Sequence, residues 1–142
     1  MSANLKLIKE RHINASVEKV WETLTETSTD WNGVHIKTTS EWKPNADIIF
    51  SFVWDGVQYA DKGKIIEFEH EKIFSHTYWS AFSGLPDQDE NYSKVQYQLF
   101  PTETGTTLKL THTDFATETM YEHSDKNWED TLDKIIEKCE TK

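Results

Sequence analysis

The chain has 142 residues, with 15 basic and 25 acidic side chains, and its formal net charge is -10. This length predicts one domain, residues 1–142, which can bury a core without disulfides or metals. Proteins bind nucleic acid mainly through Lys and Arg contacts with phosphate, so the acidic balance excludes a nucleic-acid partner and argues against an anionic membrane surface. Aromatic residues make up 13% of the chain and can bury large areas, so the sequence predicts a globular fold.

Cys139 is the only cysteine, so the chain can form no internal disulfide and no cysteine-based metal site. Its spacing from the apolar residues of the last predicted helix indicates a small core residue rather than a reactive thiol. Residues 1–4 do not begin an apolar run of signal-peptide length. No stretch reaches the roughly 20 apolar residues of a membrane-spanning helix. We therefore expect a cytoplasmic protein without a membrane partner.

The first part of the chain predicts a strand followed by a short helix. Residues 5–13 have the composition of a strand, and apolar residues then recur at helical spacing over residues 17–24. Ser16 precedes this helix, and its hydroxyl can accept a hydrogen bond from a backbone N–H of the first turn. Residues 27–33 are turn formers, so we expect a turn there, with at most one further helical turn.

Strand-like segments follow, and short polar connections join most of them. They are residues 34–42, 47–54, 57–68, 72–80, 93–100 and 106–113. Asp55-Gly56 predicts a tight hairpin, because both positions of such a turn can require positive φ. Residues 69–71 and 102–105 are further short connections, and residues 83–91 form the longest polar loop. Successive hairpins of this kind make an antiparallel sheet.

The C-terminal segment predicts one long amphipathic helix over residues 118–140. Its apolar stripe consists of Trp128, Leu132, Ile135, Ile136 and Cys139. The last two strands alternate apolar and polar residues, so each has one apolar face that needs a cover. We expect the helix to pack against Val95, Tyr97, Leu99, Leu108 and Leu110. The predicted class is α+β, with a curved antiparallel sheet wrapped around the terminal helix.

Three stretches of the chain carry a likeness to a known family. They are residues 13–21, residues 63–68 together with 72–74, and residues 105–115 followed by Trp128. They resemble the START-like (SRPBCC) superfamily, and within it the homologues of the activator of the heat-shock-protein ATPase. The resemblance covers nearly the whole chain, and the third stretch is the most specific. It implies the helix-grip fold and an internal cavity for an apolar or amphipathic ligand.

The resemblance does not imply one reaction, because relatives include cyclases, carriers and chaperone cofactors. One segment departs from the family pattern. Where the family often has paired glycines before the third strand, this chain has Lys43-Pro44-Asn45-Ala46, although Trp31 and Gly33 remain. The departure bears on the opening of the cavity more than on the fold.

His112 and Asp114 are two residues apart on a predicted strand, so both can face one way. His112 can be a polar group or general base in a cavity, or a structural histidine where the last strand meets the helix. We favour the structural role and predict no catalytic residue, because no partner at catalytic spacing is visible. His112, Glu118, Glu122 and His123 lack the spacing typical of metal ligands, so we also predict no metal site and no cofactor.

Asp61 and Glu67 are carboxylates among the apolar residues of one predicted strand. If they share an inward face with Ile65, burial would raise their pKa values and make them candidates for acid–base work. If Ile66 and Phe68 face inward instead, both carboxylates face solvent. The alternation alone does not decide between these arrangements, and exposure to solvent is the expectation that we adopt.

The aromatic residues of the strands predict a lined cavity, because pockets for small ligands are mostly apolar with few polar groups. We expect a small hydrophobic ligand between the sheet and the last helix. The expected ligand-binding residues are Phe50, Phe52, Trp54, Tyr59, Trp79, Tyr97, His112 and Trp128. Two alternatives stay open. One is a chaperone-cofactor-like protein-interaction module, whose acidic surface suits a basic partner. The other is a cyclase- or hydrolase-type enzyme using His112, Tyr97 or a buried carboxylate.

Overall fold

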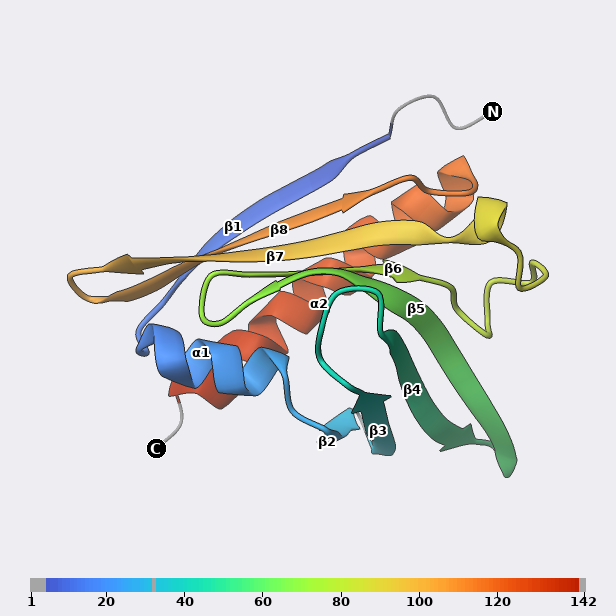
Figure 1. Cartoon of the computed structure of the whole chain (residues 1–142), viewed down its shortest axis with the longest axis horizontal. Coiled ribbons are helices and arrows are strands. Elements are labelled where there is room, and N and C mark those ends of the chain that lie inside the picture. Colours follow the sequence, from blue (N-terminus) through green and yellow to red (C-terminus); the bar gives the residue numbers. More distant parts are fainter. Residues whose placement is uncertain (1–4, 32, 141–142) are drawn as a thin grey trace.

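The protein folds into an antiparallel sheet that curves around a long terminal helix (Figure 1). The computed structural model describes residues 5–31 and 33–140. Within these residues the elements are β1 (Leu7–Ile13), α1 (Val17–Leu24), β2 (Ser28–Trp31), β3 (Val34–Ser40), β4 (Asp47–Trp54), β5 (Val57–Glu69), β6 (Ile73–Tyr78), the 3-10 turn η1 (Asp89–Asn91), β7 (Ser93–Thr102), β8 (Gly105–Thr113) and α2 (Glu118–Glu140). These strands form one sheet in the order β1-β8-β7-β6-β5-β4-β3-β2. The predicted α+β helix-grip fold is confirmed.

Helix α1 begins and ends where the sequence indicates. The Ser16 Oγ accepts the backbone N–H of Lys19 at 3.2 Å, which satisfies one donor of the first turn. At the other end, the N–H of Thr25 donates to the carbonyl of Trp21 at 3.1 Å. Val20 and Trp21 are buried, so α1 contributes one face to the core.

The segment predicted as a turn is instead the edge strand β2. It pairs antiparallel with β3, with Thr29 opposite Ile36, and the N–H of Thr38 donates to the carbonyl of Thr27 at 2.9 Å. The prediction was wrong because the edge of β3 offers free backbone donors and acceptors, and pairing with them outweighs the turn preference of Ser, Thr and Asp. Asn32, which belongs to the predicted turn, lies outside the described residues.

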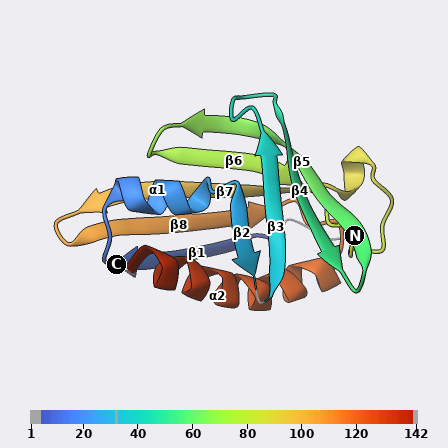
Figure 2. The same cartoon turned by 90° about the horizontal axis from the view of Figure 1, so that it is seen from below.

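The sheet changes direction along β5, the strand that pairs with both β4 and β6. A Cβ on Gly63 would lie 1.7 Å from the carbonyl oxygen of Thr77, so only glycine allows the two backbones to approach so closely. Figure 2 shows the result: β2 and β3 run across the direction of β6, β7 and β8. The bend turns the sheet into a concave wall with room on its inner side.

A β-bulge further along β5 decides which side chains face the core. Ile65 and Glu67 pair with successive residues of β6, so Ile66 between them is the extra residue of the bulge. Ile65 is 1% exposed, Ile66 is 39% exposed, and Phe68 packs against the core again. Neither of the two arrangements that the sequence left open holds along the whole strand, because the inward face carries Ile65 before the bulge and Phe68 after it.

Helix α2 runs along the inner face of the sheet (Figure 1). Leu132, Ile135 and Cys139 are buried, in one cluster with Val95, Leu99, Leu108 and Leu110. The packing predicted for the apolar stripe is confirmed. Cys139 is a core residue, and burial raises the pKa of its thiol. No helix of the described residues has both the length and the apolar character needed to cross a bilayer.

Ion pairs join β1, at one edge of the sheet, to α2. Lys9 Nζ lies 2.7 Å from Asp125 Oδ1 and also contacts the carboxylate of Glu129. Arg11 Nη2 lies 2.7 Å from Glu129 Oε1. Because the acidic partners are half exposed, these pairs orient the helix more than they stabilise the fold.

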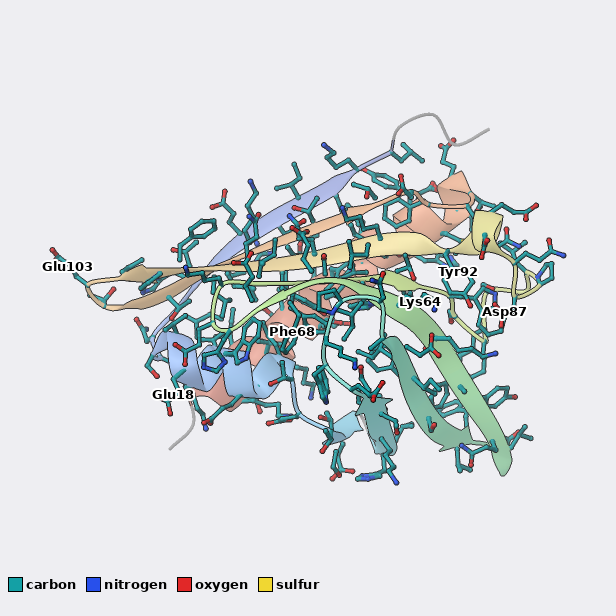
Figure 3. The ribbon with its side chains drawn as sticks, viewed as in Figure 1. Glu18, Lys64, Phe68, Asp87, Tyr92 and Glu103 are labelled. Carbon is teal, nitrogen blue, oxygen red and sulfur yellow. The ribbon has the colours of Figure 1, made fainter. Side chains whose placement is uncertain are left out.

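Side-chain contacts hold the long polar loop between β6 and β7. Figure 3 shows Asp87 and Tyr92 near one end of the molecule and Glu103 at the tip of the β7–β8 hairpin at the other. The Tyr92 hydroxyl donates to Asp87, which also pairs with Lys62 Nζ of β5 at 2.8 Å. The hydrogen bond from Lys62 lowers the pKa of the Asp87 carboxyl. The loop is thus anchored to β5.

Candidate ligand-binding cavity

A cavity of about 490 Å³ lies between the curved sheet and α2. Its lining residues come from each strand from β3 to β8 and from α2. They are Ile36, Phe50, Phe52, Asp61, His76, Tyr78, Val95, Tyr97, His112, Ser124, Asn127, Trp128, Asp130 and Thr131. This volume lies in the range of pockets that hold small organic ligands.

Aromatic rings form the apolar wall of the cavity. Phe50 of β4 and Tyr78 of β6 have ring centroids 6.1 Å apart, and Tyr97 of β7 and Trp128 of α2 have centroids 5.9 Å apart at an interplanar angle of 78°. Strand alternation brings the rings of β4, β6 and β7 to one face. The bend at Gly63 brings β4 over the helix, so that these rings surround a space instead of filling it.

His112 belongs to a chain of hydrogen bonds between β8 and α2. Its Nδ1 accepts the indole N–H of Trp128 at 2.9 Å, so Nε2 carries the proton and donates to Ser93 Oγ at 2.8 Å. The Ser93 hydroxyl in turn donates to the Tyr78 carbonyl at 3.4 Å. The indole can only donate, so the chain fixes one tautomer of the imidazole. Both ring nitrogens are used, which is the structural arrangement expected for His112.

His76 lies beside this chain and is also neutral. Burial lowers the pKa of His112 to about 3 and that of His76 to about 4. The ring of His76 donates through Nδ1–H to the carbonyl of Thr77 at 2.7 Å. Its Nε2 is therefore the acceptor nitrogen. The cavity thus contains two imidazoles that carry no charge at neutral pH.

Asp61 places a carboxylate in the cavity wall. Its Oδ2 accepts the phenol O–H of Tyr78 at 2.6 Å, and its Oδ1 accepts the backbone N–H of Ala81 at 2.8 Å. Burial raises the pKa of the Asp61 carboxyl, while these two hydrogen bonds act in the opposite direction and favour the ionised form. The expectation that Asp61 faces solvent was wrong, because Asp61 lies before the bulge and shares the inward face of Ile65.

The pair of Asp61 and Tyr78 is the closest approach to acid–base machinery in the cavity. Burial, with the nearby Asp61 charge, raises the pKa of Tyr78 well above its ordinary value, so the phenol stays protonated. Its proton is directed at Asp61 at 2.6 Å. Such a pair can accept a hydrogen bond from a ligand more readily than it can transfer a proton to one. In the described part of the chain, His, Cys, Asp and Glu side chains form no group of three able to hold a metal ion.

Five of the eight residues predicted to bind ligand line the cavity, and three lie elsewhere. Phe50, Phe52, Tyr97, His112 and Trp128 belong to the lining. Trp54 is 53% exposed, because the β4–β5 hairpin extends beyond the cavity. Tyr59 is the cross-strand partner of Phe52 and stacks on it, with centroids 5.7 Å apart, nearer the end of the hairpin. Trp79 directly follows Tyr78, so strand alternation places its side chain on the other face of the sheet. Its indole N–H donates to the carbonyl of Leu85 at 3.2 Å.

Sequence reasoning missed several lining residues. Ile36, Asp61, His76 and Val95 line the cavity but were not among the predicted site residues. Strand alternation was the available signal, since Asp61 pairs with Phe50 across β4 and β5 and so shares its face. The polar residues of α2 in the lining gave no comparable signal, because polar residues outside the apolar stripe of a helix are expected to face solvent.

Comparison with known proteins gives the family. Residues 14–139 match the family described as Activator of Hsp90 ATPase homolog 1-like protein. The chain belongs to this family. The resemblance to the START-like superfamily seen in the sequence is thereby confirmed, together with its branch. The match covers α1, all but the last residue of α2, and all of the strands except β1.

Solved structures of this fold extend over nearly the whole chain. A solution structure from Cytophaga hutchinsonii is 30% identical, with a TM-score of 0.78, and the match covers 96% of this chain and 94% of that one. A crystal structure from Chromobacterium violaceum is 16% identical, with a TM-score of 0.77 and coverages of 96% and 98%. The Aha1 dimer from Colwellia psychrerythraea is 17% identical, with a TM-score of 0.70 and coverages of 96% and 96%. No curated protein matches the chain.

Proposed function

We propose that this protein binds a small apolar or amphipathic molecule in the cavity between the sheet and α2. The observation that carries the proposal is the cavity itself, about 490 Å³ in volume and lined by aromatic and aliphatic side chains together with polar groups from the strands and α2. Pockets of this size and composition are the usual sites of small-ligand binding. Membership of a START-like family supports the same function.

Fluorescence and thermal unfolding test this proposal together. Trp128 lies in the cavity wall, whereas Trp54 is exposed at the hairpin end. A bound apolar ligand should change tryptophan emission in a saturable way, because it alters the surroundings of Trp128. The same ligand should raise the unfolding temperature, because it binds the folded state alone. A broad library of apolar and amphipathic molecules that produces neither signal would contradict the proposal.

Matched variants connect the signal to the cavity. The emission change should largely disappear in Trp128→Phe and persist in Trp54→Phe. Ile36→Phe adds volume inside the lining at a partly exposed position, so it should weaken binding while the protein stays folded. If ligands bind Ile36→Phe and the parent protein equally, the site lies elsewhere on the molecule.

A second candidate function is protein interaction, and one surface favours it. The end of the β4–β5 hairpin and the neighbouring loop expose Trp54, Val57 and Phe82, each at least 50% exposed. We call these three residues the hairpin patch. Exposed apolar patches often mark contact surfaces. The net charge of -10 favours a partner whose contact surface has a basic rim.

The family description supplies the test of this second function. Purified Hsp90 should show a higher ATPase rate when this protein is added, and Trp54→Ser should remove the increase. Ile36→Phe, which changes the cavity and not the hairpin patch, should leave the increase unchanged. If the parent protein does not change the ATPase rate, the chaperone-cofactor function is contradicted, and ligand binding is then the one function proposed.

A further inference from the structure

On the strand side of the cavity, the polar groups of Asp61 and His76 can only accept further hydrogen bonds. Asp61 carries two carboxylate oxygens, each holding a protein donor and each with a further lone pair. His76 uses its Nδ1–H on Thr77, so its Nε2 can only accept. The imidazole of His112 is saturated, because both nitrogens are engaged. A ligand that reaches these groups therefore satisfies them by donating hydrogen bonds.

The cavity offers no positive charge to balance an anionic ligand. Among the described lining residues none is a lysine or an arginine, and both histidines are neutral, with pKa values lowered by burial. Lys62, which follows Asp61 on β5, is paired with Asp87. Its Nζ also lies over the ring of Trp79, 5.6 Å from the ring centroid. Asp61 and Asp130 instead contribute acidic groups to the lining. A ligand carboxylate would be desolvated and repelled there.

The aromatic wall favours a cation over an anion. The faces of Phe50, Tyr78, Tyr97 and Trp128 carry partial negative charge, and a cation within reach of such rings is attracted to them. A nearby carboxylate adds to the attraction in a partly desolvated site. Aromatic rings, an acidic group and acceptor atoms thus act in the same direction.

From this arrangement we infer that the cavity selects ligands whose polar end is a hydrogen-bond donor without negative charge, and that Asp61 makes a protonated amine the preferred end. The inference rests on the proposed ligand-binding function and names the class of ligand for the same site. Molecules with an apolar body and an amine end belong to this class. Fatty acids do not.

Ligands that share one skeleton test the inference. The probes are 4-phenylbutylamine, 4-phenylbutan-1-ol, 4-phenylbutanoate and butylbenzene, titrated by calorimetry at neutral pH. The amine should bind more tightly than the alcohol, and the alcohol more tightly than the carboxylate. We expect the amine and the carboxylate to differ by about tenfold or more in Kd, the scale of one charge-assisted hydrogen bond.

Asp61→Asn tests the named residue with a side chain of the same shape. This substitution should weaken binding of the amine by about threefold to tenfold and remove its advantage over the alcohol. Butylbenzene should bind Asp61→Asn and the parent protein alike, which shows that the variant keeps its cavity. Asp133→Asn removes the same charge from an exposed position of α2 outside the lining, and it should leave all four affinities unchanged.

The outcomes separate this inference from the proposed function. If the carboxylate binds as tightly as the amine, or if Asp61→Asn leaves the order of affinities unchanged, the inference is overturned while ligand binding stands. If butylbenzene alone binds, the cavity is a purely apolar site and the inference is again overturned. If none of the four probes binds, the inference is overturned, and the broad ligand library then decides the proposed function separately.

Discussion

At the scale of single residues, the two buried histidines show how the core tolerates polar groups. His112 is 5% exposed and His76 is 4% exposed, yet both are hydrogen-bonded and neutral. A neutral, hydrogen-bonded imidazole costs little to bury, whereas a protonated one would have to lose its hydration. Because both histidines are neutral, they add no positive charge to the cavity wall.

The histidines predict a dependence of stability on pH. Their pKa values in the folded protein, about 3 for His112 and about 4 for His76, lie below the ordinary 6.5. The unfolded chain therefore takes up protons first as the pH falls. The stabilisation is complete above pH 6.5 and is lost as the pH falls toward the folded-state values. The free energy of unfolding, measured with urea, should decrease by up to ~1.4 kcal/mol per pH unit for each histidine in that window.

His112→Gln checks the origin of this slope. Between about pH 7 and pH 5 the variant should lose roughly half of the pH dependence, since His76 still contributes. It should also be less stable at neutral pH by about 1–3 kcal/mol, because the partners of a buried hydrogen bond lose their ideal geometry. Exposed His123→Gln is the matched control and should keep the full slope. An unchanged slope in His112→Gln would show that His112 is not a neutral buried group.

At the scale of elements, helix α2 has two functions along its length. Its C-terminal half contributes Leu132, Ile135 and Cys139 to the core. Its middle contributes Trp128 and polar residues such as Asn127 and Thr131 to the cavity. One helix therefore both completes the core and lines the cavity.

Leu132→Ala tests the core half of the helix. Leu132 is 0% exposed, so its truncation leaves a space that the surrounding side chains fill only in part. The free energy of unfolding should fall by about 2–5 kcal/mol, measured by urea denaturation. Asp133→Ala, at the next position and exposed to solvent, should change it by less than about 0.5 kcal/mol. A midpoint unaffected by Leu132→Ala would contradict the packing of α2 on the sheet.

The elements also show what the sequence predicts and what it leaves open. Helix α2 and strand β4 have the predicted bounds, because each combines a clear period with clear end signals, such as Asp55-Gly56 at the β4–β5 hairpin with φ of 51° and 77°. Strand β2 was missed because its pairing with β3 is a tertiary effect. The inward position of Asp61 was missed because a bulge at Ile66 leaves no mark in the alternation.

At the scale of the whole molecule, the bend of the sheet creates the cavity. Gly63 permits β5 to lie against Thr77 of β6, and the strands beyond it then turn over α2 (Figure 2). Without the bend, β4 would lie in one plane with β6. Its aromatic residues would then no longer line a cavity together with α2. The cavity is therefore a property of the sheet's curvature as much as of its side chains.

Gly63→Ala tests this relation between curvature and binding. The new Cβ would meet the backbone oxygen of Thr77 at 1.7 Å, and backbone atoms cannot move aside as a flexible side chain can. We expect a loss of about 1–3 kcal/mol in the free energy of unfolding, as for overpacked sites, and a weaker thermal shift with any cavity ligand. Gly56→Asn is the control, because no heavy atom lies within 4 Å of its Cβ and Asn tolerates positive φ. Equal behaviour of the two variants would show that Gly63 does not set the bend.

Some residues that shape the cavity lie outside the core that stabilises the fold. Ile36 and Phe52 line the cavity from β3 and β4 but lie outside the core, whereas Leu108, Leu110 and Leu132 of the core lie on β8 and α2. Substitutions in the first group can change which molecule fits at little cost to folding. Under the proposed ligand-binding function, natural selection can therefore vary ligand preference while the core stays the same, so homologous copies can diverge in specificity before they diverge in architecture.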